Sequence, residues 1–171
     1  MDMTQQLPFL KKKALKFEDY AHLTYETMFD PAQRQGAVAY TANWLQTSVL
    51  WNDGSGFRLE ALPLEAQVAP AFGIIAQDLD GDNLTDIWLG GNFYGLKPEV
   101  GRHDSSRGVF LRGDGKGGFT CLPPADSGLF VKGEVRDAAT FQTANGPIIL
   151  VARNDADALV FKPGMANTQL R

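Results

Sequence analysis

The chain has 171 residues, of which 44% are hydrophobic and 21% charged, so it is long enough to form a domain with an apolar core. Its formal net charge is −4 at pH 7, and this acidic balance argues against a protein that follows the phosphates of nucleic acid. The 18 glycines and 9 prolines are typical of many short strands joined by tight turns.

Other coarse features exclude further classes. The single cysteine, Cys121, excludes an internal disulfide, and its place in an expected strand favours an inert thiol over a nucleophile. No stretch approaches the roughly 18 apolar residues of a membrane-spanning helix. The first residues, MDMTQQLPFLKKK, lack the apolar centre of a secretory signal. We therefore expect no membrane span and no signal peptide in this chain.

Residues 1–35 are expected to be a helical segment. From residue 10 onward, apolar side chains such as Phe17, Tyr20 and Met28 recur every three or four positions, which predicts an amphipathic α-helix. The basic run at 11–13 is interpreted as a solvated helix start, since the acidic remainder argues against nucleic acid or an anionic membrane.

From Gly36 the pattern changes to strands. A strand is possible at 37–43, and stronger ones are expected at 48–52 and 57–62, joined by the turn Asp-Gly-Ser-Gly at 53–56.

Four aspartates follow the next apolar run, at relative positions 1, 3, 5 and 9: Asp78, Asp80, Asp82 and Asp86. Carboxylates this close repel one another unless a cation lies between them. Ca²⁺ takes six to eight oxygen ligands, so these side chains, with the Leu84 main-chain carbonyl at position 7, predict a calcium site. Zinc is disfavoured because the loop has no Cys or His, and Mg²⁺ demands stricter geometry. Leu89 stands where an EF-hand needs its bidentate Glu, which excludes that motif.

These residues resemble a known family. Phe72-Gly73, the DxDGDxxxD core and the Gly90-Gly91 pair resemble an FG-GAP (VCBS-type) repeat, the blade of a calcium-binding β-propeller also found in integrin α subunits. Asn83 departs from the commonest version, which has Gly. Nearly the full length, including the GNFYG, SGL and GEVRDA patches, resembles the C-terminal part of bacterial VCBS-repeat proteins with an ASPIC/UnbV segment. The resemblance implies an extracellular, periplasmic or cell-surface location.

The hairpins repeat within the chain. SVLWNDGSGFRLEALP matches GVFLRGDGKGGFTCLPP, which predicts strands at 108–112 and 118–122 after the one at 85–89. In a third copy, residues 133–141 (GEVRDAATF) take the place of GIIAQDLDG and retain one acid, Asp137, at the expected strand end, and further strands are expected at 148–153 and 158–162. The predicted fold is mainly β: a partial β-propeller of about two to three four-stranded antiparallel blades, at 36–70, 71–127 and 128–171, after the N-terminal amphipathic helix. Such a piece cannot close a ring, so we expect a homo-oligomer or docking against missing blades.

The long segment 94–107 is the main candidate for binding, although a structural loop packed on the neighbouring blade explains it equally well. His22 and His103 suggest no catalytic dyad, and no catalytic residue is assigned. The favoured function is a non-catalytic, calcium-binding scaffold that recognises a protein or a glycan. One alternative is a propeller-based glycan-processing or hydrolytic enzyme using Glu99 and Asp104. Another is an assembly module that oligomerises through open blade faces.

Overall fold

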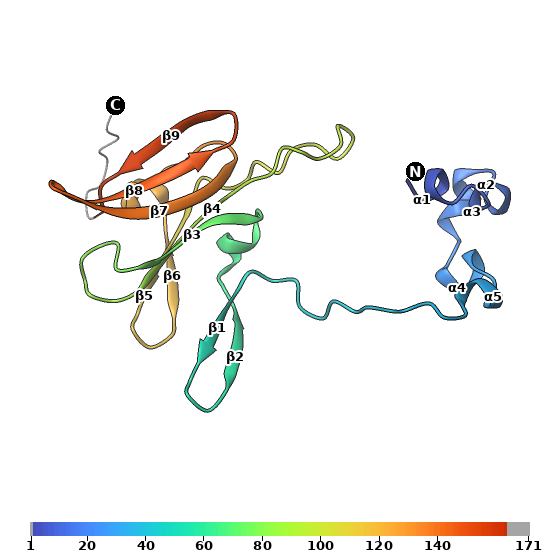
Figure 1. Ribbon diagram of the computed structural model, residues 1–171, viewed down its shortest axis with the longest axis horizontal. Helices are drawn as coiled ribbons and strands as arrows, with labels where there is room; N and C mark the ends of the chain where they lie inside the picture. Colours follow the sequence, from blue (N-terminus) through green and yellow to red (C-terminus); the bar gives the residue numbers. More distant parts are fainter. Residues whose placement is uncertain (1, 164–171) are drawn as a thin grey trace. The chain divides into compact units, whose positions relative to one another are not determined.

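The computed structural model describes residues 2–163, so Met1 and the end of the expected third blade at 164–171 lie outside the described residues. The chain divides into two compact units, Met1–Trp44 and Leu45–Arg171. The first contains only short helices, and the second is mainly β (Figure 1).

The first unit contains five short helices instead of the one amphipathic helix predicted across 10–35, and that prediction is wrong. They are α1 (Asp2–Gln6), α2 (Leu10–Lys13), α3 (Phe17–Ala21), α4 (Tyr25–Met28) and α5 (Pro31–Arg34). New helices start where capping residues stand: the Thr24 hydroxyl accepts the Thr27 N–H, and Pro31 is at the first position of α5. Because new helices start at these residues, the segment with the apolar period forms several short helices.

The basic run lies at the end of α2. Lys13 donates from Nζ to the Met28 carbonyl and pairs with the Asp30 carboxylate, both at 3.0 Å. Leu10 and Met28 are the buried residues among those of this unit whose burial the structure describes, and the Phe9 and Phe29 rings meet edge to face at 6.1 Å. Lys13 therefore joins α2 to the last residue of α4 and to the residue that precedes α5. Lys11 and Lys12 are exposed.

The second unit contains three antiparallel sheets. The first is the hairpin of β1 (Ser48–Asn52) and β2 (Phe57–Ala61), and the short 3₁₀ turn η1 (Leu64–Gln67) follows it. The second has the order β3 (Ala71–Gln77), β4 (Asp86–Gly91), β5 (Val109–Gly113), β6 (Phe119–Leu122). After the single turn α6 (Pro124–Ser127), the third has the order β7 (Val135–Thr143), β8 (Gly146–Arg153), β9 (Ala156–Phe161). The mainly β, antiparallel part of the predicted fold is confirmed.

The central sheet is packed on both faces, and every residue of β4 is buried. Successive side chains of a strand point to opposite faces, so Trp88 packs against the third sheet while Ile87 and Leu89 pack towards the first. Gly90 gives the Trp88 ring its space, because a Cβ there would lie 2.5 Å from the ring. β4 thus belongs to both hydrophobic clusters.

Two sequence predictions about strands are wrong. Residues 37–43 form no strand, since they have no neighbouring strand to accept and donate ladder hydrogen bonds. Asp137 was expected at a strand end, but it lies inside β7, which continues to Thr143. Among the described residues, the sheets have two, four and three strands in chain order, so the middle copy is the one that forms a sheet of four strands.

Candidate metal centre

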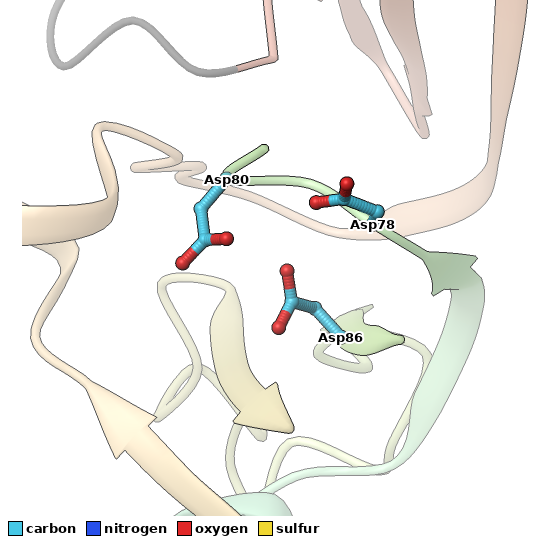
Figure 2. Close-up of side chains that lie close together, drawn as sticks. All are labelled: Asp78, Asp80 and Asp86. Atoms are coloured by element: carbon cyan, nitrogen blue, oxygen red, sulfur yellow. The ribbon is translucent and has the colours of Figure 1, made fainter. Parts of the chain in front are cut away.

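The acidic loop connects β3 to β4. Asp78 follows the last residue of β3, Asp80 lies in the loop, and Asp86 is the first residue of β4. One carboxylate oxygen from each of these three residues lies within 4.8 Å of the others. Figure 2 shows the three side chains converging on the same space from different parts of the loop.

Backbone amides donate to all three of these carboxylates, and Asp80 Oδ1 accepts the Asp82 N–H at 3.2 Å. The Asp78 oxygens accept the N–H groups of Gly81 (2.7 Å) and Asn83 (2.9 Å). Asp86 is fully buried, and its two oxygens accept the Leu79 and Gly113 N–H groups, each at 3.0 Å. Asp86 therefore ties the start of the loop to the end of β5.

The bend of the loop depends on two residues with positive φ. Gly81 has φ 91° and Asn83 has φ 66°. Asn tolerates the left-handed conformation better than most residues with a side chain. Asn83 can therefore hold the bend at this position without a glycine.

Two of the five predicted ligands are placed differently. Asp82 lies outside the group of three; its Oδ1 accepts the Leu84 N–H at 2.8 Å, which makes it a turn residue in this structure. Leu84 takes part in that turn through its amide. The structure thus brings together Asp78, Asp80 and Asp86, and the roles of Asp82 and of the Leu84 carbonyl stay predictions.

The sequence analysis missed Arg112, which is next to this loop. It belongs to β5, and its Nε lies 2.7 Å from Asp80 Oδ2. The one available signal was its position at the end of the strand predicted at 108–112, which follows the strand predicted at 85–89 in the chain. The guanidinium offsets one of the three carboxylate charges and leaves a formal excess of two negative charges. One divalent cation would balance that excess.

The donor set fits a hard divalent cation. Carboxylate oxygens suit Ca²⁺ and Mg²⁺, whereas zinc sites use His and Cys. Two oxygens bound to one Ca²⁺ at about 2.3–2.6 Å can be separated by at most about 5 Å. The oxygens of the three carboxylates, within 4.8 Å of one another, fall inside that limit. The geometry therefore allows all three to bind one ion with little movement.

The other candidate surface, segment 94–107, is an ordered loop. The Tyr94 hydroxyl donates to Asp104 at 2.6 Å, and Arg107 pairs with the same carboxylate at 3.0 Å. The Tyr94 hydrogen bond, followed by Arg107, lowers the pKa of Asp104, and the same bond raises the pKa of Tyr94. Asp104 is thus held as an anion by Tyr94 and Arg107, with a longer hydrogen bond of 3.4 Å from Asn92, while Glu99 is exposed.

This loop is also anchored to the third sheet. The buried Asn92 donates to the Ser106 and Gly133 carbonyls, each at 2.9 Å, and the Tyr94 N–H donates to Glu134 at 2.9 Å. His103 and Phe93 exchange backbone hydrogen bonds of 2.9 Å across the base of the loop. These contacts favour a structural loop packed on the neighbouring sheet.

Glu134 is the buried carboxylate at this junction. It accepts the Tyr94 N–H and an Asn154 amide N–H at 2.7 Å, and it pairs with Arg136 at 2.6 Å. The Tyr94 amide, then Asn154 and Arg136, lower the pKa of Glu134 because all of them favour its charged form. The anion therefore fastens the loop to the third sheet.

Comparison with protein-family models, with curated proteins and with solved structures finds no match for this chain. Within residues 2–163, no helix has the length and apolar character needed to cross a membrane.

Proposed function

We propose that the chain is a non-catalytic, calcium-stabilised scaffold of the β-propeller type that recognises a protein or a glycan. The observation that carries the proposal is the convergence of Asp78, Asp80 and Asp86 at the junction of two strands. A cation there would bridge the end of β3 to the start of β4. When bound, it would supply electrostatic neutralisation of the carboxylates and no chemistry on a substrate.

The propeller architecture is supported by the order of the sheets. Each sheet is antiparallel and follows the chain order, and the central one is packed on both faces, as blades are in a propeller. We propose the divisions at 36–70, 71–127 and 128–171 as three blades, one for each of the sheets of two, four and three strands. The similarity of the acidic loop to an FG-GAP (VCBS-type) repeat is part of the same proposal.

A structural ion suits an extracellular, periplasmic or surface protein, which we propose for this chain. Extracellular calcium modules work with dissociation constants of about 10⁻⁴–10⁻³ M, and a loop with three carboxylates and a competing arginine is suited to that weak range. The enzymatic alternative would need Asp104 to leave Tyr94 and Arg107 before it could act with Glu99.

Thermal unfolding with and without CaCl₂ tests the metal proposal. A site 99% occupied adds about 2.7 kcal/mol to the free energy of unfolding, which raises the melting temperature of a domain of this size by several degrees. The shift should be larger with Ca²⁺ than with Mg²⁺ at equal concentration. It should disappear in Asp80→Asn and persist in the matched control Asp137→Asn, whose exposed acid lies inside β7. Equal shifts in the two variants would refute the assignment.

A further inference from the structure

We propose that the edge of β1 opposite β2, at Leu50, is a docking site for an extended, uncharged polypeptide strand from a partner protein. The inference rests on the partner-recognition part of the proposed function and gives it a location; Asn83, Leu84 and Thr85 of the acidic loop form part of the wall of this site. Two packed sheets in the second unit are mismatched in width. The sheet of β1 and β2 has two strands, and the central sheet on which it packs has four.

The mismatch leaves a groove beside β1. A hollow of about 500 Å³ is lined by Val49, Leu50 and Trp51 on the β1 side, and by Ala76, Ile87 and Phe119 of the central sheet opposite. Volumes of about 300–1,000 Å³ are typical of binding pockets. Its walls are completed by uncharged loop residues, including glycines of the turn between β5 and β6.

The register of the hairpin shows which backbone groups face the groove. Leu62 N–H donates to Thr47 O (3.0 Å) at one end, and Asp53 N–H donates to Gly56 O (3.2 Å) at the other. Hydrogen-bonded and non-hydrogen-bonded pairs alternate in an antiparallel ladder, so Leu50 and its partner Leu59 form a non-hydrogen-bonded pair. Leu50 therefore directs its N–H and C=O away from β2, towards the groove.

The face across the groove continues an existing interface. Ile87 and Leu89 belong to the cluster that packs the hairpin on the central sheet, and Ile74 pairs with Leu89 on the same face. Ile74 is nevertheless 58% exposed, because the hairpin does not reach it. A strand added to β1 would extend the packing from Ile87 towards Ile74.

Charge identifies the occupant. The chain has 20 acidic residues and 16 lysines and arginines, yet none of the described residues that line the groove is charged. A charged side chain placed there would lose its hydration without gaining a partner. The fitting occupant is thus an extended segment with uncharged side chains, which adds main-chain hydrogen bonds to the Leu50 edge and places alternate side chains against Ile87.

The chain itself supplies a probe. In the third sheet, β8 is the middle strand, in the position that no described strand occupies beside β1, and its residues 146–152 (GPIILVA) carry no charge. A synthetic peptide with this sequence, made soluble by a Gly-Ser spacer and two terminal lysines, is titrated into the full chain by calorimetry. The matched peptide is N-methylated at alternate residues, which removes donors without changing the side chains.

Two proline variants localise the binding. Leu50→Pro removes the N–H that faces the groove, whereas Leu59→Pro removes the equivalent N–H on the outer edge of β2, and both leave the ladder between β1 and β2 intact. We expect the peptide to bind the native chain and Leu59→Pro alike, and to bind Leu50→Pro at least about tenfold more weakly. Ala76→Glu, which puts a charge in the groove, should weaken binding as well.

Contrary outcomes are distinct. No binding at millimolar peptide, or equal binding by the two proline variants or the two peptides, overturns the proposal. A native chain that sediments as a dimer, with Leu50→Pro monomeric, shows that a second copy is the occupant and also overturns it. All variants should keep the calcium-dependent rise in melting temperature, so failure of the strand site and failure of the metal site are recognised separately.

Discussion

Two connections between neighbouring strands can be compared, from β3 to β4 and from β7 to β8. Where β3 ends, β7 lies beside it but continues as a strand. Gln77, the last residue of β3, accepts a hydrogen bond of 3.0 Å from Thr140 of β7, so the two strands run side by side there. β3 then gives way to the acidic loop, whereas β7 continues to Thr143 and turns tightly into Gly146. Where the acids are missing, the strand simply goes on. The aspartates therefore end a strand as well as offer a metal site.

The largest expected effect comes from Asp86→Ala. It leaves the buried N–H groups of Leu79 and Gly113 without their acceptor, which should lower the free energy of unfolding by about 2–4 kcal/mol. Urea denaturation without calcium measures it. Asp137→Ala, in the exposed part of β7, should change the same quantity by less than about 0.5 kcal/mol. Similar losses in both would mean that the two regions do not differ as described.

The bend of the loop is tested at Asn83, whose φ is 66°. Asn83→Val forces a β-branched residue into the left-handed region and should cost about 1–2 kcal/mol. Asn83→Gly removes the steric restriction and should be neutral or slightly stabilising in the folded chain. Denaturation midpoints compare the two. If valine and glycine gave the same midpoint, the strain would lie elsewhere.

Acid should loosen the junction between the two sheets through Glu134. Its pKa is lowered in the folded chain, so its contribution to stability is fully present above the ordinary value of 4.5 and is lost as the pH falls through the lower, folded-state value. Unfolding free energies measured between pH 7 and pH 3 should decline in this window. Glu134→Gln should show a shallower decline there; an unchanged slope would assign the acid sensitivity to other carboxylates.

The smallest effect is expected from Arg112→Gln. The ion pair with Asp80 is half exposed, so its loss should lower the metal-free stability by less than about 1 kcal/mol. Removal of the competing guanidinium should at the same time tighten calcium binding several-fold, measured by calorimetry. Weaker binding instead would show that Arg112 prepares the loop for the ion.

The sequence was sufficient for the local parts of the fold. Four predicted strands agree with the structure to within one residue: 48–52 and 57–62 with β1 and β2, and 108–112 and 118–122 with β5 and β6. They could be predicted because alternating residues and Asp-Gly turns act over short distances. The prediction of a single helix across 10–35 was wrong because it followed the spacing of apolar residues. Residues that start new helices, such as Thr24 and Pro31, were given too little weight. The strand at 37–43 failed because a strand needs a partner, which no local pattern guarantees.

The site was predicted in its chemistry and only partly in its geometry. Spacing sufficed to single out Asp78, Asp80 and Asp86, but it could not separate them from Asp82, which the folded loop uses for a turn. Arg112 could not be found because it is brought to Asp80 by the pairing of β4 with β5. Long-range partners of this kind follow from sheet register, which the sequence only approximates.

The burial of β4 on both faces has a consequence for local dynamics. A strand whose side chains serve two clusters cannot detach without disrupting both, so its amide protons should exchange with deuterium only through global opening. Since Asp86 is its first residue, an ion held there would slow exchange across Trp88 and its neighbours, well beyond the atoms that it touches.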